Sequence, residues 1–255
     1  MNTHDKIITR IGLTLFFVMA LLALLANAQF GGFVHDQPFL AADDGEVEAS
    51  LWQSKLWLWW DGSDLADGDV SEWTNKLTGL ALKAPAAANK PTAASGWVTF
   101  DGVDDMLTNT IAITSTNWAV SWILTNVVNE AYGVMNAGTT EQDAFWISSM
   151  RLTSLNAGTP SFEVQNIPAN VFFYAVWNCA SNDLSSSIYT NGIKATPIGG
   201  SGRVISPVTF QKFGNGSASG FSGEIAEMLF WTNVLSEAEI ADFHTYVTNK
   251  YGAIP

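Results

Sequence analysis

The chain has 255 residues, and its 11 Lys and Arg against 24 Asp and Glu give a formal net charge of −13 at pH 7. A protein of this charge repels phosphate backbones, so nucleic acid is not expected as a partner. Cys179 is the single cysteine. No disulfide can therefore form within the chain, and we expect Cys179 to be a small buried hydrophobic residue in a strand.

The N-terminus has the pattern of a secretory leader. Lys6 and Arg10 precede an apolar run that ends in Ala26-Asn27-Ala28, and small residues at these positions are what a signal peptidase reads. We predict that residues 1–28 are a cleaved signal peptide. The alternative is an uncleaved signal anchor over residues 11–28, which would be the chain's one contact with a membrane. Both alternatives export the rest of the chain, because the cations precede the apolar run.

The segment after the leader, residues 29–50, shows little alternation of apolar and polar residues and is rich in acids, which predicts an extended arm or linker. We expect residues 51–255 to form one domain, since sandwiches of more than 200 residues are common. Short runs separated by Gly, Asn, Ser and Thr clusters predict that this domain is all-β. The expected strands are Lys55–Trp60, Gly96–Phe100, Trp118–Thr125, Ala144–Ser149, Ser161–Gln165, Val171–Asn178, Ser187–Thr190 and Ile225–Trp231.

The last thirty residues predict a strand, a short turn and a capped helix. With strict alternation, Ile225, Leu229 and Trp231 share one face of the strand. Ser236 and Glu239 form the S-x-x-E capping box that opens a helix. The helix has an apolar stripe at three- and four-residue spacing, and Gly252 suits the position after its end. The stripe consists of Ile240, Phe243, Val247 and Tyr251.

Four further motifs precede this tail in a fixed order. They are L-W-L-W-W-D-G-S-D at residues 56–64, G-D-V-S-E-W-T-N-K at 68–76, F-D-G-V-D-D-M-L at 100–107 and I-Y-T-N-G at 188–192. Together with the tail they resemble the laminin G-like (LamG/pentraxin-type) domains of the bacterial and phage kind, in the concanavalin A-like lectin and glucanase superfamily. The resemblance implies a secreted jelly-roll β-sandwich of two antiparallel sheets with one short C-terminal α-helix.

The F-D-G-V-D-D motif has two readings. In the structural one, Asp101 accepts backbone N–H bonds in an Asx turn and Gly102 adopts a positive φ, which fixes a tight reversal at the sheet rim. In the other, a calcium ion is bound by carboxylates on loops that converge in this fold, although the spacing is not that of an EF-hand. The candidate ligands are Asp61, Asp64, Asp101, Asp104 and Asp105.

Eleven tryptophans are many for this length, and aromatic faces are what proteins use to stack on sugars. Adjacent strand residues point to opposite faces, so Trp59 and Trp60 cannot both enter one core. We expect most tryptophans, among them Trp73, Trp177 and Trp231, to be core residues. The candidates for stacking on a ligand are Trp60, Trp97 and Trp146.

Two loops rich in Gly, Asn, Ser and Thr, residues 136–143 and 214–221, offer polar side chains and backbone amides to sugar hydroxyls. Asn136, Asp143 and Asn215 are their candidate ligand-binding residues. The alternative is that both loops are ordinary hairpin tips.

The sequence predicts that the chain is not an enzyme. The nearest approach to the carboxylate pair of the related glycosidases is Glu224 and Glu227, which strict alternation puts on opposite faces of a strand, so that they cannot flank one glycosidic bond. His4, His35 and His244 lie in the leader, the arm and the terminal helix, so no zinc cluster or Ser-His-Asp arrangement is visible.

Taken together, these patterns favour a secreted, non-catalytic carbohydrate-binding or adhesion domain, whose partner is a glycan or a cell-surface polysaccharide. The alternative is a structural protein of an extracellular assembly or virion. In that case the same sandwich supplies packing surface to copies of itself or to other envelope or virion proteins.

Overall fold

The computed structural model describes residues 50–128, 134–136, 144–148, 151–156, 159–165, 170–180, 186–196, 208–214 and 220–254. The chain divides into two units, Met1–Glu48 and Ala49–Pro255, and every described residue belongs to the second. The predicted leader and nearly all of the predicted arm therefore lie outside the described residues. In the part of the chain that is described, no helix is long and apolar enough to cross a bilayer.

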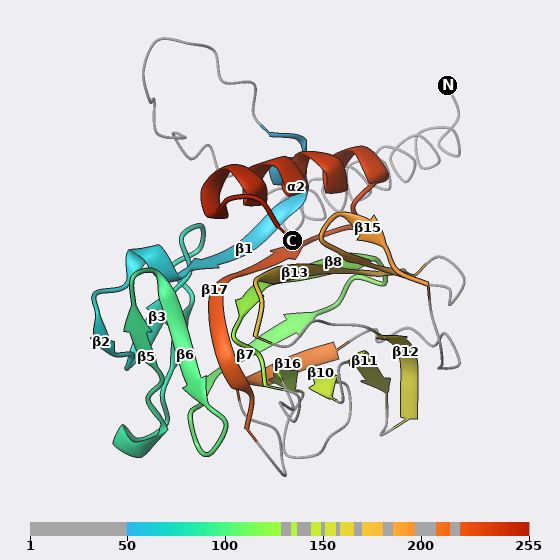
Figure 1. Cartoon of the computed structure of the whole chain (residues 1–255). Helices are drawn as coiled ribbons and strands as arrows, with labels where there is room; N and C mark the ends of the chain where they lie inside the picture. Colours follow the sequence, from blue (N-terminus) through green and yellow to red (C-terminus); the bar gives the residue numbers. More distant parts are fainter. Residues whose placement is uncertain are drawn as a thin grey trace, which may run out of the picture. The chain divides into compact units, whose positions relative to one another are not determined.

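Two antiparallel sheets form the sandwich (Figure 1). Within the described residues the first sheet has nine strands, and β1 (Leu56–Asp61) pairs with β17 beside the main path. The other strands, in spatial order, are β15 (Ile193–Lys194), β14 (Ser187–Thr190), β13 (Phe173–Cys179), β8 (Trp118–Thr125), β17 (Ser222–Trp231), β6 (Trp97–Asp101), β5 (Thr92–Ala94) and β2 (Gly68–Asp69).

The second sheet has eight strands in the same described ranges. In spatial order they are β12 (Thr159–Gln165), β11 (Arg151–Asn156), β10 (Ala144–Ser148), β9 (Met135–Asn136), β16 (Val208–Phe213), β7 (Leu107–Ile113), β4 (Ala81–Lys83) and β3 (Glu72–Thr74). The 3-10 helices are η1 (Leu51–Lys55), η2 (Gly62–Asp64) and η3 (Ala87–Asn89), and the α-helix is α2 (Glu237–Tyr251). This arrangement confirms the predicted jelly-roll β-sandwich with a C-terminal helix.

The main core lies between the two sheets. Along β8, Val120, Trp122 and Leu124 belong to this inter-sheet cluster, whereas Ala119 and Ile123 belong to a second cluster on the other face. This division follows from the alternation of side chains along a strand. Trp73, Trp177 and Cys179 are also buried in the inter-sheet cluster, as predicted.

The second cluster is the layer between the first sheet and α2 (Figure 1). Helix α2 buries Ile240, Phe243 and Val247 there, which confirms the predicted apolar stripe. Ser236 and Glu239 form the capping box, with each side chain bonded to the other residue's backbone N–H. Trp59 lies in this layer and Trp60 in the inter-sheet core, so the two adjacent tryptophans do point to opposite faces.

Strand β17 departs from strict alternation. Its register against β8 shifts between Ile225 and Glu227, and a β-bulge of this kind adds one residue to one strand. Ile225 consequently faces the inter-sheet core, while Leu229 and Trp231 face the helix layer. The prediction that these three share a face is therefore wrong.

Candidate functional site

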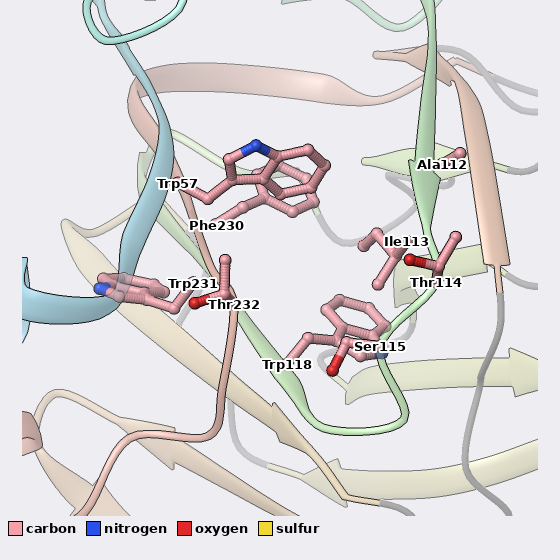
Figure 2. Close-up of a pocket in the computed structure, with 9 residues that line it drawn as sticks. All are labelled: Trp57, Ala112, Ile113, Thr114, Ser115, Trp118, Phe230, Trp231 and Thr232. Atoms are coloured by element: carbon pink, nitrogen blue, oxygen red, sulfur yellow. The ribbon is translucent and has the colours of Figure 1, made fainter. Parts of the chain in front are cut away.

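A cavity of about 190 Å³ opens where β1 and the end of β17 face the end of β7 and the start of β8 (Figure 2). It draws residues from both sheets, so it lies at the mouth of the sandwich. We call it the mouth pocket. Its lining residues are Trp57, Ala112, Ile113, Thr114, Ser115, Trp118, Phe230, Trp231 and Thr232.

The mouth pocket has an apolar floor and a polar rim. Ile113, Trp118 and Phe230 are buried, at 5%, 1% and 0% exposure, because their strands direct them into the inter-sheet core. Three residues with hydroxyl groups are exposed at the edge, and these rim residues are Thr114, Ser115 and Thr232. An apolar cavity with a few convergent polar groups is the usual form of a small-molecule site.

A second β-bulge places Trp57 in the pocket. The register of β1 against β17 shifts between Leu56 and Leu58, and both Trp57 and Leu58 pack against the inter-sheet cluster. With strict alternation Trp57 would join Trp59 under α2. Bulges often re-aim a side chain next to a functional site. The bulge leaves Trp57 half-buried, with one part packed and another facing the cavity.

The rim is held in place by hydrogen bonds that leave donors for a ligand. The Ser115 hydroxyl donates to the Asn117 carbonyl over 2.6 Å, and both the Thr232 hydroxyl and its backbone N–H donate to the Lys55 carbonyl. The Trp57 indole N–H and the Thr114 hydroxyl have no hydrogen-bond partner among the residues that the structure describes.

The predicted ligand-binding residues do not form one site. The prediction that Trp60 stacks on a ligand is wrong. Its side chain is 0% exposed, because it points inward from β1 and packs against Phe213 and Phe230. Trp97 is half-buried on the helix side of β6, against Phe172 and Tyr251.

The remaining candidates of this set are not tested. Asn136 and Trp146 belong to β9 and β10 of the second sheet. Their side chains, and the whole of Asp143 and Asn215, lie outside the described residues.

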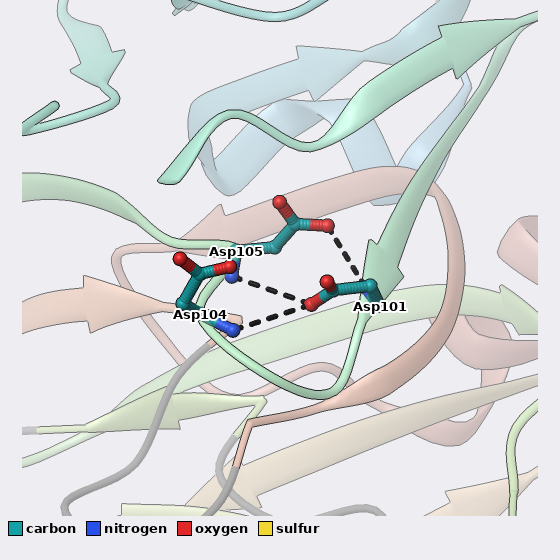
Figure 3. Close-up of side chains that lie close together, drawn as sticks. All are labelled: Asp101, Asp104 and Asp105. Atoms are coloured by element: carbon teal, nitrogen blue, oxygen red, sulfur yellow. Dashed lines mark hydrogen bonds between the residues drawn. The ribbon is translucent and has the colours of Figure 1, made fainter. Parts of the chain in front are cut away.

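Three of the five predicted metal ligands lie together, with one carboxylate oxygen of each within 4.8 Å of the others (Figure 3). They are Asp101, Asp104 and Asp105. Asp101 Oδ1 accepts the backbone N–H of Val103 over 2.7 Å, and Gly102 has a φ of 79°. The predicted Asx turn is therefore confirmed.

Burial raises the pKa of Asp105 to about 6, and the negative charges of Asp101, Asp104 and Asp69 add to this rise. Asp105 Oδ2 accepts a hydrogen bond from the Asp101 backbone N–H. Asp101 Oδ1 accepts the backbone N–H groups of Val103 and Asp104 in the turn. The cluster still offers carboxylate oxygens at a point where negative charge is crowded. Oxygen donors of this kind suit a hard cation such as Ca²⁺, which also needs carbonyls or water to complete six to eight ligands.

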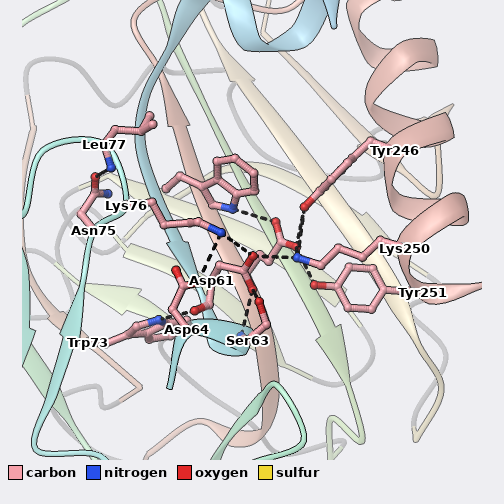
Figure 4. Close-up of polar contacts among 12 residues, drawn as sticks. Asp61, Ser63, Asp64, Trp73, Asn75, Lys76, Leu77, Tyr246, Lys250 and Tyr251 are labelled. Atoms are coloured by element: carbon pink, nitrogen blue, oxygen red, sulfur yellow. Dashed lines mark hydrogen bonds and ion pairs between the residues drawn. The ribbon is translucent and has the colours of Figure 1, made fainter. Parts of the chain in front are cut away.

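Asp61 and Asp64 lie elsewhere, in a network of ions between β1, β17 and α2 (Figure 4). Asp61 is 2% exposed and accepts Lys250 Nζ over 2.7 Å and Lys76 Nζ over 3.1 Å. Lys76 also pairs with Asp64. The structure thus divides the predicted metal set, because these two carboxylates are already paired with lysines.

Glu227 is the second acid of this network. It has no exposed surface, and it lies directly across from Asp61 in the pairing of β17 with β1. Its Oε1 accepts hydrogen bonds from Lys250, Tyr246 and Tyr251, at 2.6, 2.7 and 2.6 Å, and its Oε2 accepts one from Trp59 at 2.9 Å. Because of the bulge in β17, Glu227 shares a face with Glu224, contrary to the prediction.

Neither a protein-family model nor a curated protein matches the sequence. Similar solved structures include the Trypanosoma rangeli sialidase in complex with sialic acid, at 13% identity and a TM-score of 0.55, covering 78% of this chain and 34% of that one. Others are domain 4 of an extracellular arabinanase from Geobacillus stearothermophilus in complex with arabinotriose (12%, 0.46, 74% and 98%) and a pentraxin from Limulus polyphemus (15%, 0.44, 62% and 84%).

These likenesses correct the prediction that the chain is not an enzyme. Sialidases are enzymes, and about a third of each of these sialidase chains shares this fold, so the fold gives no ground for excluding catalysis. The prediction also assumed that Glu224 and Glu227 lie on opposite faces of their strand, and the bulge in β17 puts them on the same face. Conversely, the chain spans about a third of the length of the sialidases at 11–13% identity, which does not establish an activity. The likeness shows the fold, a jelly-roll β-sandwich.

Proposed function

We propose that this chain is an exported carbohydrate-binding β-sandwich of the laminin G-like type, which holds one sugar ring of a glycan in the mouth pocket. The observation that carries the proposal is the bulge in β1, which turns Trp57 toward a cavity rimmed by three hydroxyl-bearing residues.

The chemistry of a sugar ring matches this lining. One face of a pyranose presents C–H groups, which pack on an aromatic ring, while its edge carries hydroxyls that need hydrogen-bond partners. Trp57 supplies a large rigid surface with a free indole N–H, and Thr114 supplies a hydroxyl that can both donate and accept, whereas the hydroxyls of Ser115 and Thr232 already donate to protein carbonyls. At about 190 Å³ the cavity is smaller than the roughly 300–1,000 Å³ of drug-sized sites, which suits one ring.

A glycan array probed with the chain from residue 29 onward tests the proposal. We expect saturable binding that Trp57→Ala reduces at least tenfold, about 1.4 kcal/mol. Trp97→Ala is the matched control, since Trp97 is also half-buried on a strand but does not line the pocket. Thermal unfolding of both variants separates lost binding from lost folding.

The outcomes divide the candidate functions. Binding that survives in Trp57→Ala and is lost in Trp97→Ala would contradict the mouth pocket and move the site to the helix side. No binding to any glycan, together with a defined oligomer in light scattering, would contradict sugar binding. The structural protein of an extracellular assembly or virion would then be the better account.

A further inference from the structure

We infer that the mouth pocket selects uncharged sugars and rejects sugars that carry a carboxylate. This inference rests on the proposed function and specifies its class of ligand. Among the described residues, the lining contains three hydroxyls, an indole N–H and apolar groups, and no charged side chain. A carboxylate that enters such a site loses water and finds no cation, which is strongly unfavourable.

One cation is linked to the pocket rim and has other partners. It is Lys55, whose backbone carbonyl accepts the hydroxyl of Thr232. Its ammonium group bonds Glu239 over 2.8 Å and the Val234 carbonyl over 3.3 Å. A carboxylate in the pocket would have to compete with Glu239 for this charge, at the expense of the helix cap that Glu239 forms.

The charge of the whole chain acts in the same direction. A formal net charge of −13 creates a negative field around the protein. This field lowers the local concentration of anions and leaves that of neutral ligands unchanged. The selectivity therefore has a short-range part, the absence of a cation in the described lining, and a long-range part that salt screens.

The rim of the mouth pocket offers an uncharged ligand hydrogen bonds in place of an ion pair. The Thr114 hydroxyl can turn to donate or accept, so it fits a hydroxyl of a neutral sugar whichever way that hydroxyl points, whereas the hydroxyls of Ser115 and Thr232 already donate to protein carbonyls. Thr114 has no protein partner among the described residues and lies at the exposed edge of the cavity, where a ligand hydroxyl can complete it.

The test is an array of glycans ending in glucose, galactose or mannose, printed beside the same glycans ending in the corresponding uronic acid or in sialic acid. We expect the neutral ends to bind at least tenfold more tightly. Binding of acidic ends with equal or greater affinity would overturn the inference while leaving sugar binding intact. Binding of neither kind would instead overturn the proposed function.

A gain of charge gives the second readout. Thr114→Arg adds a cation at the rim, and we expect it to raise affinity for the acidic ends at least tenfold. Thr116→Arg is the control, because Thr116 is exposed on the same loop but does not line the cavity. The two variants change the net charge equally, so an equal gain in both would show a field effect alone and contradict selection by the lining.

Discussion

Glu227 shows how a charged residue is accommodated beneath a helix. Its carboxylate is removed from water, yet four side-chain donors surround it, and one of them, the Lys250 ammonium, forms ion pairs with both Glu227 and Asp61. A buried charge is tolerated only when it is paired and hydrogen-bonded in this way. Because its partners Tyr246, Lys250 and Tyr251 all lie on α2, the network fixes the helix on the sheet.

We predict that Glu227→Gln lowers the free energy of unfolding by about 3 kcal/mol, because one partner of a buried ion pair is lost. The new amide also has one acceptor oxygen fewer, so the Trp59 N–H either faces an amide donor or loses its acceptor. Urea denaturation measures the change. Glu224→Gln, on the same face of β17 but half-exposed, should shift it by less than about 0.5 kcal/mol. Equal effects of the two substitutions would contradict the role given to the network.

Calcium at the Asp101, Asp104 and Asp105 cluster is a prediction at the same scale. We expect 10 mM Ca²⁺ to stabilise the protein by roughly 1.4 to 2.7 kcal/mol, the value for a site with a Kd of about 10⁻³ to 10⁻⁴ M. The measurement is Tm with and without Ca²⁺ at pH 7.5. Asp104→Asn should abolish the response and leave the turn intact, because the turn uses the Asp101 carboxylate.

Asp64→Asn is the control for that experiment, since Asp64 pairs with Lys76 and lies apart from the three-carboxylate cluster. It should keep the full response to Ca²⁺. A Tm that Ca²⁺ does not change in the native protein would show that the prediction is wrong and leave the cluster with its structural role as an Asx turn.

At the scale of the element, the stability that the start of α2 contributes depends on pH. Burial pushes the pKa of Glu239 upward, but hydrogen bonds from Lys55 and Ser236 outweigh it and hold the pKa below its usual 4.5. An acid whose pKa falls on folding stabilises the folded state above its unfolded pKa, and this contribution is lost as the pH falls through the folded value. The loss should therefore occur below about pH 4.5.

We predict that Glu239→Gln is less stable than the native protein by up to about 1 kcal/mol at pH 7 and that the difference closes toward pH 3. Urea denaturation at pH 7, 5, 4 and 3 measures it. Glu237→Gln, an exposed acid in the same turn, should show a smaller difference at pH 7. A gap for Glu239→Gln that stays constant across this range would contradict the charge pairing with Lys55.

Elements with a local signal could be predicted from the sequence. The capping box and apolar stripe of α2 are local patterns, and so is Asn191-Gly192, the dipeptide that a type I′ turn requires, which has φ of 52° and 80° in the turn between β14 and β15. Strands β7 and β16 were not predicted. Thr108, Asn109 and Thr110 interrupt the apolar residues of β7, and the register of β7 against β16 shifts at this stretch, so no local alternation of apolar and polar residues marks the strand.

The two bulges explain why the site was not predicted. A bulge depends on the register of the partner strand, which no local pattern records. With strict alternation Trp57 lies on the same face as Trp59, whereas the extra residue in β1 turns Trp57 to the cavity.

At the scale of the whole molecule, the chain has no disulfide to hold its layers together, so packing must do so. Helix η1 lies at the start of the described domain and belongs to this packing. Trp52 is 0% exposed in the helix layer, and its ring contacts Trp231 and Phe243. Its carbonyl also accepts the Trp231 indole N–H over 2.7 Å.

We therefore predict that the folded domain begins at residue 50. A chain of residues 50–255 should unfold cooperatively with the Tm of residues 29–255, whereas residues 56–255 should lose at least about 3 kcal/mol, the cost of emptying a buried tryptophan site. Trp52→Ala in the longer chain separates packing from length and should reproduce most of that loss. Leu51→Ala is its neighbour control, because Leu51 is 57% exposed. A Tm of residues 56–255 equal to that of the longer chains would contradict this prediction and place the domain boundary at β1.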